Sequence, residues 1–325
     1  MALCVIIFTY LQCTRQFQKE EKTKMKRILC AGLAVADIPV LPVSASAFER
    51  DSSNIEPLRV LTGGDALNEA IVLRRLGVDS ALSACVGNDL WGECILSTLK
   101  AEGVDARFVV QLNDCPTTTS VVLIEPDGER HFLISRGSLE RFTLRPDPAM
   151  KAYDIISIAS LWGLPGLTLD ALREFSAFAH ENHIRITADF TQDMASMGLD
   201  YIRAALSLVD DLFPSLDEAQ AITGEREPEA MLRALASFGP QRVVLKLGAQ
   251  GSMALVNGKL YRQPSLAGRI VDTTGAGDNF VGAYLACMAR DIDTSRSLEI
   301  ASRAAARCVG ALGATGARYT FEELL

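Results

Sequence analysis

Short runs of β-branched and other apolar residues alternate along this chain with longer segments in which apolar residues recur every three or four positions. The short runs predict buried strands, and the longer segments predict amphipathic helices. Strands are predicted at 27–33, 80–86, 155–158, 184–188, 208–213 and 242–247, and helices at 66–76, 90–102, 167–182, 228–238 and 295–312. This alternation indicates a doubly wound α/β fold, with a mostly parallel sheet flanked by helices on both faces.

Two segments depart from that alternation. Residues 38–61 hold two extended runs around a polar middle, and residues 108–133 contain short strand-like runs joined by turns, among them Glu125-Pro126-Asp127-Gly128. Proline followed by Asp-Gly favours a tight turn. We therefore predict a small antiparallel β lid from about 38–62 and 107–135, set apart from the main sheet and placed to close over a ligand.

Residues 1–24 are predicted to lie outside the folded domain, which would comprise residues 25–325. An apolar beginning is followed by a charged stretch over 15–27. A secretory signal has the opposite order, with positive charge first, and the apolar run is too short to cross a bilayer. Met25 directly precedes the first predicted strand, so we expect translation to begin there; the alternative is a peripheral membrane anchor.

The composition of the chain disfavours several classes of function. The 325 residues include 40 acidic and 32 basic side chains, a formal net charge of −8, which disfavours binding to a nucleic-acid backbone. No apolar stretch is long enough to predict a membrane-spanning helix. The eight cysteines form no Cys-x-x-Cys pair and have no histidine cluster beside them, so reduced thiols in a cytoplasmic protein fit better than zinc or disulfides.

The strongest chemical signal lies between Val271 and Phe280, where Gly275-Ala276-Gly277-Asp278 precedes a helical pattern. Glycines at a helix N-terminus let the backbone approach a ligand and expose amide groups that attract an anion. A carboxylate beside such a site repels the anion, unless it takes a proton from a hydroxyl that attacks a phosphoryl group. Taken alone, the segment is more typical of a packing turn in which Asp278 caps the helix.

A weaker signal opens the predicted helix at 66–76. Gly63 and Gly64 precede Asp65-Ala66-Leu67-Asn68, a spacing that suits a turn presenting the Asn68 amide to a polar ligand. By itself this segment is more typical of an ordinary helix start.

Together, and in this order, the two segments resemble both signatures of the PfkB/ribokinase family of carbohydrate kinases. These signatures are Gly-Gly-x-x-x-Asn early in the chain and Asp-Thr-x-Gly-Ala-Gly-Asp near its end, here Asp272–Asp278. The resemblance extends from about Lys26 to Leu325, and the Gly63–Ala70 sequence looks most like a subgroup of bacterial sugar kinases. It implies a ribokinase-like fold, ATP and Mg²⁺ as cofactors, and phosphorylation of a hydroxyl on a sugar or sugar derivative.

The resemblance also implies residue roles at the reacting centre. Asp278 matches the general base. The residues that match the anion hole are Gly275, Ala276 and Gly277. The residues that match the contacts to the substrate hydroxyls are Asp37, Gly63, Gly64 and Asn68.

On the nucleotide side, the resemblance implies contacts from Lys246, Gly248, Gly251, Thr274 and Cys308. Lys246 would meet the phosphates of ATP as a point charge. Glu218 matches an acidic residue that acts on Mg²⁺ through water, although Ser215 stands where the family has Asn. Asp272, with the carbonyl groups of Thr274 and Gly313, matches a K⁺ site of many relatives.

The substrate stays open at this point, because pentoses, ketohexoses, sugar phosphates, sugar acids and nucleosides are all substrates in this family. Aromatic residues make up 6% of the chain, which weakly disfavours a pocket that stacks a nucleobase. The alternatives are a nucleoside kinase and a non-catalytic protein that senses a sugar or nucleotide. A nicotinamide-dependent oxidoreductase is excluded, because Phe280 stands where the dinucleotide fingerprint needs glycine.

Three further features have open roles. Asp189 ends a predicted strand, where doubly wound sheets place ligands, and is a candidate on the substrate side. Around the lid and its exit lie Arg130, His131, Arg136 and Arg141; we expect a solvated face, and the alternative is contact with an acidic or phosphorylated substrate. The exposed edge of the lid predicts a homodimer.

Overall fold

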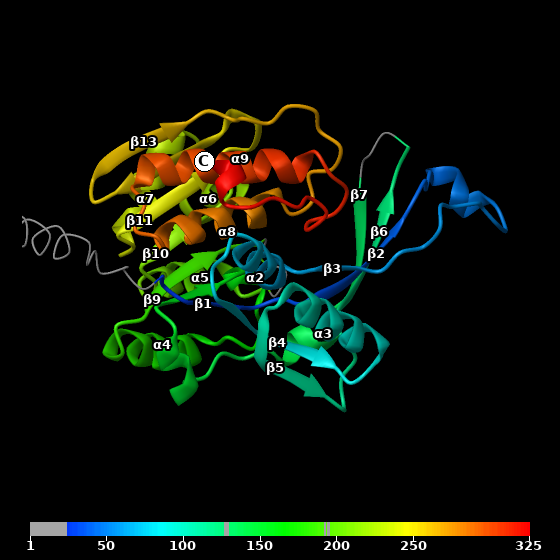
Figure 1. The fold of residues 1–325 in the computed structure, drawn as a ribbon, viewed down its shortest axis with the longest axis horizontal. Coiled ribbons are helices and arrows are strands. Elements are labelled where there is room, and N and C mark those ends of the chain that lie inside the picture. The colour runs from blue at the N-terminus through cyan, green and yellow to red at the C-terminus, as the bar shows by residue number, and fades with distance from the viewer. Residues whose placement is uncertain (1–24, 127–129, 192, 194–195) are drawn as a thin grey trace, which may run out of the picture.

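The computed structural model describes residues 25–126, 130–191, 193 and 196–325 (Figure 1). The strands of its main sheet are β1 (Ile28–Ala31), β4 (Ser80–Gly87), β5 (Asp105–Leu112), β8 (Ile155–Ile158), β9 (Arg185–Asp189), β10 (Asp211–Phe213), β11 (Arg242–Lys246), β12 (Ser252–Val256) and β13 (Lys259–Gln263). Within the described residues they form a nine-stranded sheet in the order β13-β12-β11-β10-β9-β8-β1-β4-β5. The strands from β11 to β5 run parallel, and β12 is antiparallel to both of its neighbours.

The helices cover both faces of this sheet (Figure 1). They are α2 (Asp65–Arg75), α3 (Leu90–Glu102), α4 (Leu169–Glu181), α5 (Gly198–Leu206), α6 (Leu216–Thr223), α7 (Pro228–Ser237), α8 (Ala276–Met288) and α9 (Thr294–Val309). The predicted fold class is confirmed: helices flank a mostly parallel sheet.

The central strand β1 shows how one apolar run builds two cores. Ile28 and Cys30 pack into a cluster with α2, α3, α8 and α9, whereas Leu29 and Ala31 pack into a second cluster with α4–α7. Successive side chains of a strand point to opposite faces. A parallel strand covered by helices on both sides is therefore apolar at every position.

Strand β1 also lies at the point where the strand order reverses. The chain continues from β1 outward through β4 and β5 on one side, and from β8 outward through β9–β11 on the other. Ligands of doubly wound sheets bind beyond the carboxyl ends of the strands at such a point. Here Gly32 follows β1 with φ +147°, and a Cβ atom on it would lie 2.5 Å from the carbonyl oxygen of Ala159.

A second, smaller sheet stands beside the main one, at the right of Figure 1. Its strands are β2 (Val35–Val40), β3 (Leu61–Gly63), β6 (Thr119–Ile124) and β7 (Arg130–Ser135), in the order β3-β2-β6-β7. The two outer pairings are antiparallel, and the central pairing of β2 with β6 is parallel. Since β2 follows β1 and β3 leads into α2, this lid adjoins the carboxyl ends of the central strands.

The second predicted lid segment begins too early in the chain. Its first residues lie in β5, which pairs in parallel with β4 at the edge of the main sheet. The pattern of residues 105–112 fits either sheet, and the long-range pairing with β4 decides between them.

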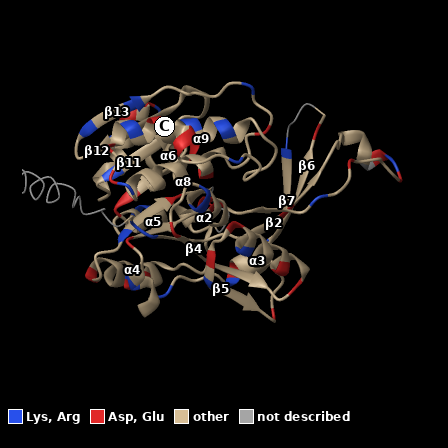
Figure 2. Ribbon diagram, in the orientation of Figure 1, with Lys and Arg blue, Asp and Glu red and all other residues tan. Residues whose placement is uncertain are grey.

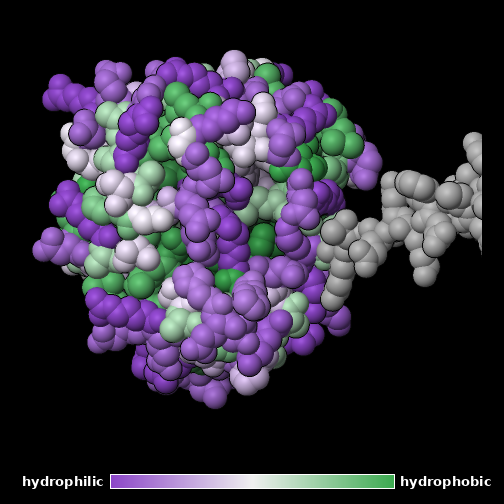
Figure 3. Space-filling view, turned by 90° about the vertical axis from the view of Figure 1, so that its left-hand side faces the viewer, coloured by the Kyte–Doolittle hydropathy of each residue, from purple (hydrophilic) through white to green (hydrophobic). Residues whose placement is uncertain are grey.

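Lys and Arg residues are interspersed with Asp and Glu over the helices and loops (Figure 2). On the end of the molecule remote from the lid, hydrophilic side chains interleave with smaller hydrophobic patches (Figure 3). In the part of the chain that the structure describes, no helix is both long and apolar enough to cross a membrane.

Candidate active site

The glycine turn before α8 is fixed by close packing. Gly275 caps the helix with φ +74°, and a Cβ atom on it would lie 2.3 Å from the Cβ of Ala314. The side-chain amide of Asn279 donates to the carbonyl oxygens of Gly275, at 2.8 Å, and of Ala314, at 2.7 Å. The first-turn N–H groups of a helix have no partner within it; here that of Ala276 donates to the Thr273 carbonyl oxygen at 3.3 Å, and the turn lies at the positive end of the α8 dipole.

The two glycine motifs meet at Asp278. The side-chain nitrogen of Asn68, on α2, donates to a carboxylate oxygen of Asp278, on α8, at 2.6 Å. The helices approach closely because Gly282 faces Val72: a Cβ atom there would lie 2.8 Å from a methyl carbon of that valine. The sequence-predicted general base and the sequence-predicted sugar motif therefore share one site.

Asp37 reaches the same site from the lid strand β2. Its carboxyl lies against Gly63, where a Cβ atom would be 1.9 Å from Oδ2 of Asp37. Burial and then the nearby charge of Asp278 raise the pKa of Asp37 to about 7. This carboxyl thus titrates in the physiological range and is sensitive to the charge of Asp278.

Acidic side chains gather around Asp278. Burial, then repulsion by Asp278, raises the pKa of Asp65, whose carboxylate accepts a hydrogen bond from Ser160 Oγ. Burial, then repulsion by Asp189, raises the pKa of Glu69, which accepts a hydrogen bond from Ser157 at 2.7 Å. The pKa of Asp278 is itself raised, chiefly by burial, while the hydrogen bond from Asn68 opposes that shift.

A buried ion pair adjoins the glycine turn. Lys246 Nζ, at the end of β11, contacts both carboxylate oxygens of Asp189, at the end of β9, at 2.7 and 2.8 Å. Burial alone would lower the pKa of Lys246, but Asp189 and Glu218 outweigh it and raise that pKa. The ammonium group lies 3.4 Å from where a Cβ atom of Gly277 would stand, so it sits beside the amides that open α8.

A pocket of about 540 Å³ opens next to this ion pair, within the volume range of small-molecule sites. Its lining includes Lys246, Gly248 and Gly251, and Ala276 and Gly277 at the start of α8. The apolar residues Ile270, Phe280, Ala305 and Val309 also line it. A lining that combines a cation with apolar side chains suits a ligand with an anionic part and an apolar part.

Comparison with known proteins agrees with this geometry. Residues 25–319 match the family model described as pfkB family carbohydrate kinase. The chain belongs to that family. It is 26% identical over 277 residues to an ATP-dependent 6-phosphofructokinase of Thermoanaerobacterium thermosaccharolyticum, covering 77% of this chain and 80% of the relative. It is 27% identical over 265 residues to a fructosamine kinase of Bacillus subtilis, covering 80% and 87%.

Solved structures show the same fold. A ribokinase of Arabidopsis thaliana complexed with ribose and ATP superimposes with a TM-score of 0.77 at 23% identity, covering 92% of this chain and 97% of that one. A nucleoside kinase of Methanocaldococcus jannaschii also gives a TM-score of 0.77, at 21% identity, covering 93% and 97%. The chain is thus a carbohydrate kinase by family and ribokinase-like by fold.

The residues of this kinase fit Mg²⁺ bound mainly through ATP and water. Among the described residues, no group of three or more His, Cys, Asp or Glu side chains is arranged to hold a metal ion. Mg²⁺ usually keeps several waters and takes one or two carboxylates. Glu218 fits that role in part: one of its carboxylate oxygens accepts the Ser215 N–H at 2.7 Å, in a capping box that opens α6.

The arrangement at Asp272 does not favour K⁺. One carboxylate oxygen accepts hydrogen bonds from Arg130 at 2.8 Å and from the Thr274 N–H at 2.9 Å, and the other accepts the Gly313 N–H at 2.8 Å. The carbonyl oxygen of Thr274 accepts the Cys308 thiol at 3.3 Å, and that of Gly313 accepts the Gly316 N–H at 3.1 Å. The groups proposed to hold the cation are therefore engaged within the chain.

The structure places the other predicted residues as follows. Gly64, with φ +92°, forms the turn between Gly63 and α2. Cys308 is fully buried, whereas Ala305, one turn earlier on α9, lines the pocket. The functional roles of all these residues stay predictions. The sequence interpretation did not single out Asp65 and Glu69, although Asp65 stands three residues before Asn68 and four before Glu69, spacings at which helical side chains are neighbours.

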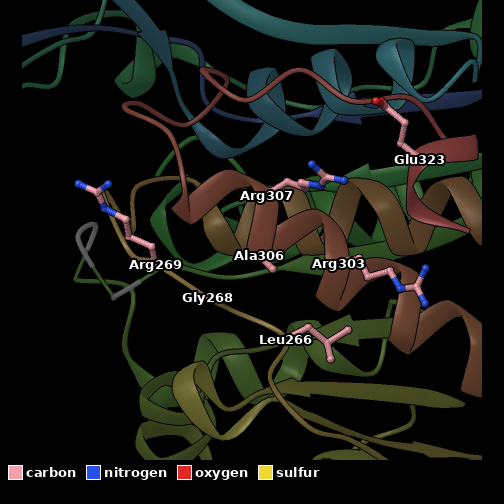
Figure 4. A pocket seen from close by; sticks show the side chains of 7 residues that line it. All are labelled: Leu266, Gly268, Arg269, Arg303, Ala306, Arg307 and Glu323. Atoms are coloured by element: carbon pink, nitrogen blue, oxygen red, sulfur yellow. The ribbon is translucent and has the colours of Figure 1, made fainter.

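A second hollow, of about 390 Å³, adjoins the 540 Å³ pocket and shares Leu266, Gly268 and Ala306 with it. Arg269, Arg303 and Arg307 line this hollow, but their guanidinium groups point in different directions (Figure 4). Arg303 is engaged by Glu299 at 2.6 Å. These side chains therefore do not converge on a single anion.

Proposed function

We propose that this kinase transfers the γ-phosphoryl group of ATP to a hydroxyl of a sugar or sugar derivative. The observation that carries the proposal is the 2.6 Å hydrogen bond from Asn68 to Asp278, because it joins the sugar-side motif to the phosphate-side turn. The curated relatives named phosphofructokinase and fructosamine kinase support an acceptor of this class.

In the proposed mechanism, Asp278 takes the proton of the acceptor hydroxyl as its oxygen attacks the γ-phosphorus in line. Burial, which raises the pKa of Asp278, makes it a stronger base than an ordinary aspartate, and the hydrogen bond from Asn68 orients it. The amides of Gly275–Gly277 and the α8 dipole face the charge that spreads over the transferred group.

ATP is proposed to lie in the 540 Å³ pocket, with its phosphates toward Lys246 and Gly277. The buried ammonium of Lys246 supplies a positive charge at that end, and Asp189 fixes its position. When bound with ATP, Mg²⁺ would neutralise charge on the phosphates, and Glu218 would hold it through water.

The lid is proposed to exclude water during transfer and to pair with a second copy of the chain. Its edge strand β7 exposes three consecutive apolar residues, Phe132, Leu133 and Ile134, to 51%, 58% and 44%. Such an edge favours pairing with another chain, which supports a homodimer. A cytoplasmic location stays a prediction from the cysteine pattern.

The test of the proposed function is turnover of Asp278→Asn. We expect both ligands to bind and ATP-dependent turnover to fall by about 10²–10⁴-fold, the usual contribution of a general base. Asp170→Asn is the matched control, because Asp170 is also an acidic residue in the first turn of a helix and lies at the surface. Near-normal turnover of the Asp278 variant would reject the assignment.

A panel of acceptors tests the alternatives. ATP consumption is measured with sugars, sugar acids, sugar phosphates and nucleosides. Preference for nucleosides would favour a nucleoside kinase, a class with which the chain shares its fold. Binding without ATP consumption by any acceptor would favour a non-catalytic sensing protein.

A further inference from the structure

Helix α9 lines the 540 Å³ pocket over two of its turns. Val309, at the C-terminal end of α9, lines the pocket together with Lys246 and Gly277. Its carbonyl oxygen accepts the Asp272 N–H at 3.2 Å, so this end of α9 adjoins the segment that leads into the glycine turn. Ser302 also lines the pocket but stands seven residues earlier, about 10 Å back along the helix. With the phosphates at the glycine turn, as proposed, Ser302 therefore lies on the side of the nucleoside.

The hydroxyl of Ser302 is available to a ligand. Ser302 is only 6% exposed, yet its hydroxyl makes no hydrogen bond to another residue that the structure describes. By contrast, the hydroxyl of Ser297, on the same helix, donates to the carbonyl oxygen of Asp293 at 2.8 Å. Largely buried polar groups normally have a hydrogen-bond partner. An unpaired hydroxyl in the lining of a pocket therefore indicates a ligand that hydrogen-bonds to it.

The pocket offers a nucleobase few other polar side chains. Among its described lining residues, those with polar side chains are Lys246, Ser265, Thr273 and Ser302. Lys246 and Thr273 lie beside the glycine turn, and Ser265 Oγ accepts the Ala267 N–H at 3.3 Å. The arginines that line the adjoining 390 Å³ hollow do not line this pocket. The side chains left to meet the base are thus hydroxyls, which rotate and can either donate or accept a hydrogen bond.

We infer that Ser302 hydrogen-bonds the base of the phosphoryl donor and that, because a hydroxyl serves an amino or an oxo substituent equally, the kinase uses the purine nucleoside triphosphates ATP, ITP and GTP alike. The inference rests on the proposed function and defines its donor. A site with fixed donors or acceptors rejects a ligand that cannot match them by several orders of magnitude. A rotating hydroxyl leaves no buried polar group unpaired with any of these bases, so it imposes no such penalty.

The test compares donors that differ only in the base. ITP carries an oxo group where ATP carries the 6-amino group, and GTP carries an oxo group there and a further amino group at C2. With one acceptor held at a fixed concentration, we expect kcat/KM of the wild type for ITP and for GTP to lie within about tenfold of the value for ATP. Calorimetry with the non-hydrolysable β,γ-imido analogues of the three donors, in the presence of Mg²⁺ and without acceptor, gives a readout independent of turnover.

Ser302→Ala removes the hydroxyl and keeps a residue that favours the helix. We expect the dissociation constants of all three analogues to rise together by about two- to tenfold, the usual net effect of one hydrogen bond, while the ratios between them stay as in the wild type. Ser295→Ala is the matched control, because Ser295 also lies on α9 but is exposed and does not line the pocket. This variant should bind all three analogues as the wild type does.

Discrimination of more than about tenfold between ATP and ITP by the wild type would overturn the inference and leave the proposed function intact. Unchanged dissociation constants in a folded Ser302→Ala protein would also overturn it, because Ser302 would then not contact the donor. If the analogues bind but no acceptor in the wider panel is phosphorylated by any donor, the proposed function itself fails, and this outcome is distinct from the other two.

Discussion

Asn68 donates its side-chain N–H to Asp278 across 2.6 Å, although the two residues are 210 positions apart in the chain. Asn68 stands in the second turn of α2 and Asp278 in the first turn of α8. Packing of these two helices therefore sets the orientation of the proposed base. The hydrogen bond also favours the charged form of Asp278, against the effect of burial.

Replacing Asn68 by Ala should reduce the fraction of the proposed base, Asp278, that is ionised at neutral pH. Burial already raises the pKa of Asp278, and loss of the Asn68 hydrogen bond removes an influence that lowers it. The pKa then rises further, so the acid limb of the kcat/KM profile moves to higher pH, and kcat at neutral pH falls by roughly tenfold or more. The profile is measured from about pH 5 to 9.

Asn88→Ala serves as the comparison, because the Asn88 amide makes its hydrogen bond, to Asn113 at 2.9 Å, at the surface. An unshifted acid limb in Asn68→Ala would mean that Asn68 does not act on Asp278.

The pair of Lys246 and Asp189 should contribute strongly to stability as a unit. Its side chains are only 14% and 2% exposed, and removing one partner leaves a buried charge without a counter-charge. We expect Lys246→Met and Asp189→Asn each to lower the free energy of unfolding by about 3–5 kcal/mol, and the double variant to recover part of that loss. Denaturant unfolding of all four proteins gives the coupling energy.

The exposed pair of Arg173 and Asp170 is the control cycle, with an expected coupling below about 1 kcal/mol. Simple additivity at Lys246 and Asp189 would show that the two side chains are not coupled. Both variants that lack Lys246 should also bind ATP more weakly, which calorimetry measures directly.

Local signals account for the elements that the sequence predicts best. Helix α3 has its predicted bounds because the Asp89 side chain accepts the Gly92 N–H at one end and Gly103 adopts the left-handed conformation at the other. The hairpin of β12 and β13 is absent from the prediction, although Asn257-Gly258 between the strands is a strong hairpin signal. The local sequence therefore contains enough information to predict this hairpin.

The candidate active site is harder to predict than these elements, because its contacts depend on packing between residues far apart in the chain. The two glycine motifs identify Asp278 and Asn68 from sequence, but nothing local places Lys246 against Asp189 or Arg130 against Asp272. Likewise, whether residues 105–112 belong to the lid or to the main sheet depends on the strand with which they pair, and that strand is β4. Such pairings are set by the order of strands in the sheet, which a pattern of apolar residues does not specify.

Ionisation of Asp37, which is proposed to bind the substrate, should lower the free energy of unfolding at high pH. Its pKa in the folded protein is about 7, raised from 3.8 first by burial and then by Asp278. The folded state thus holds a proton that the unfolded chain releases, so this group's contribution to stability falls as the pH rises from about 4 to 7. Asp37→Asn, which never ionises, should therefore melt at a higher temperature than the wild type at pH 8, and the difference should vanish toward pH 4.

Thermal melts of both proteins between pH 4 and 8 measure this difference. The same variant should show a higher KM for the acceptor with little change in the KM for ATP, since Asp37 is proposed to contact the acceptor. An Asp37→Asn protein that melts below the wild type at pH 8 would contradict the assigned direction of the pKa.

Arg130 should supply, from within the chain, the positive charge that neutralises Asp272. Burial alone would raise the pKa of Asp272, but hydrogen bonds from the Thr274 and Gly313 backbone and the charge of Arg130 lower it. We therefore expect wild-type kcat to be the same in KCl and in choline chloride at equal ionic strength. Arg130→Met should lower kcat by about tenfold and should be partly rescued by K⁺, because it removes the positive charge that neutralises Asp272. Arg141→Met, which removes an exposed lid arginine paired with Asp114, should show neither effect, and strong activation of the wild type by K⁺ would refute the role given to Arg130.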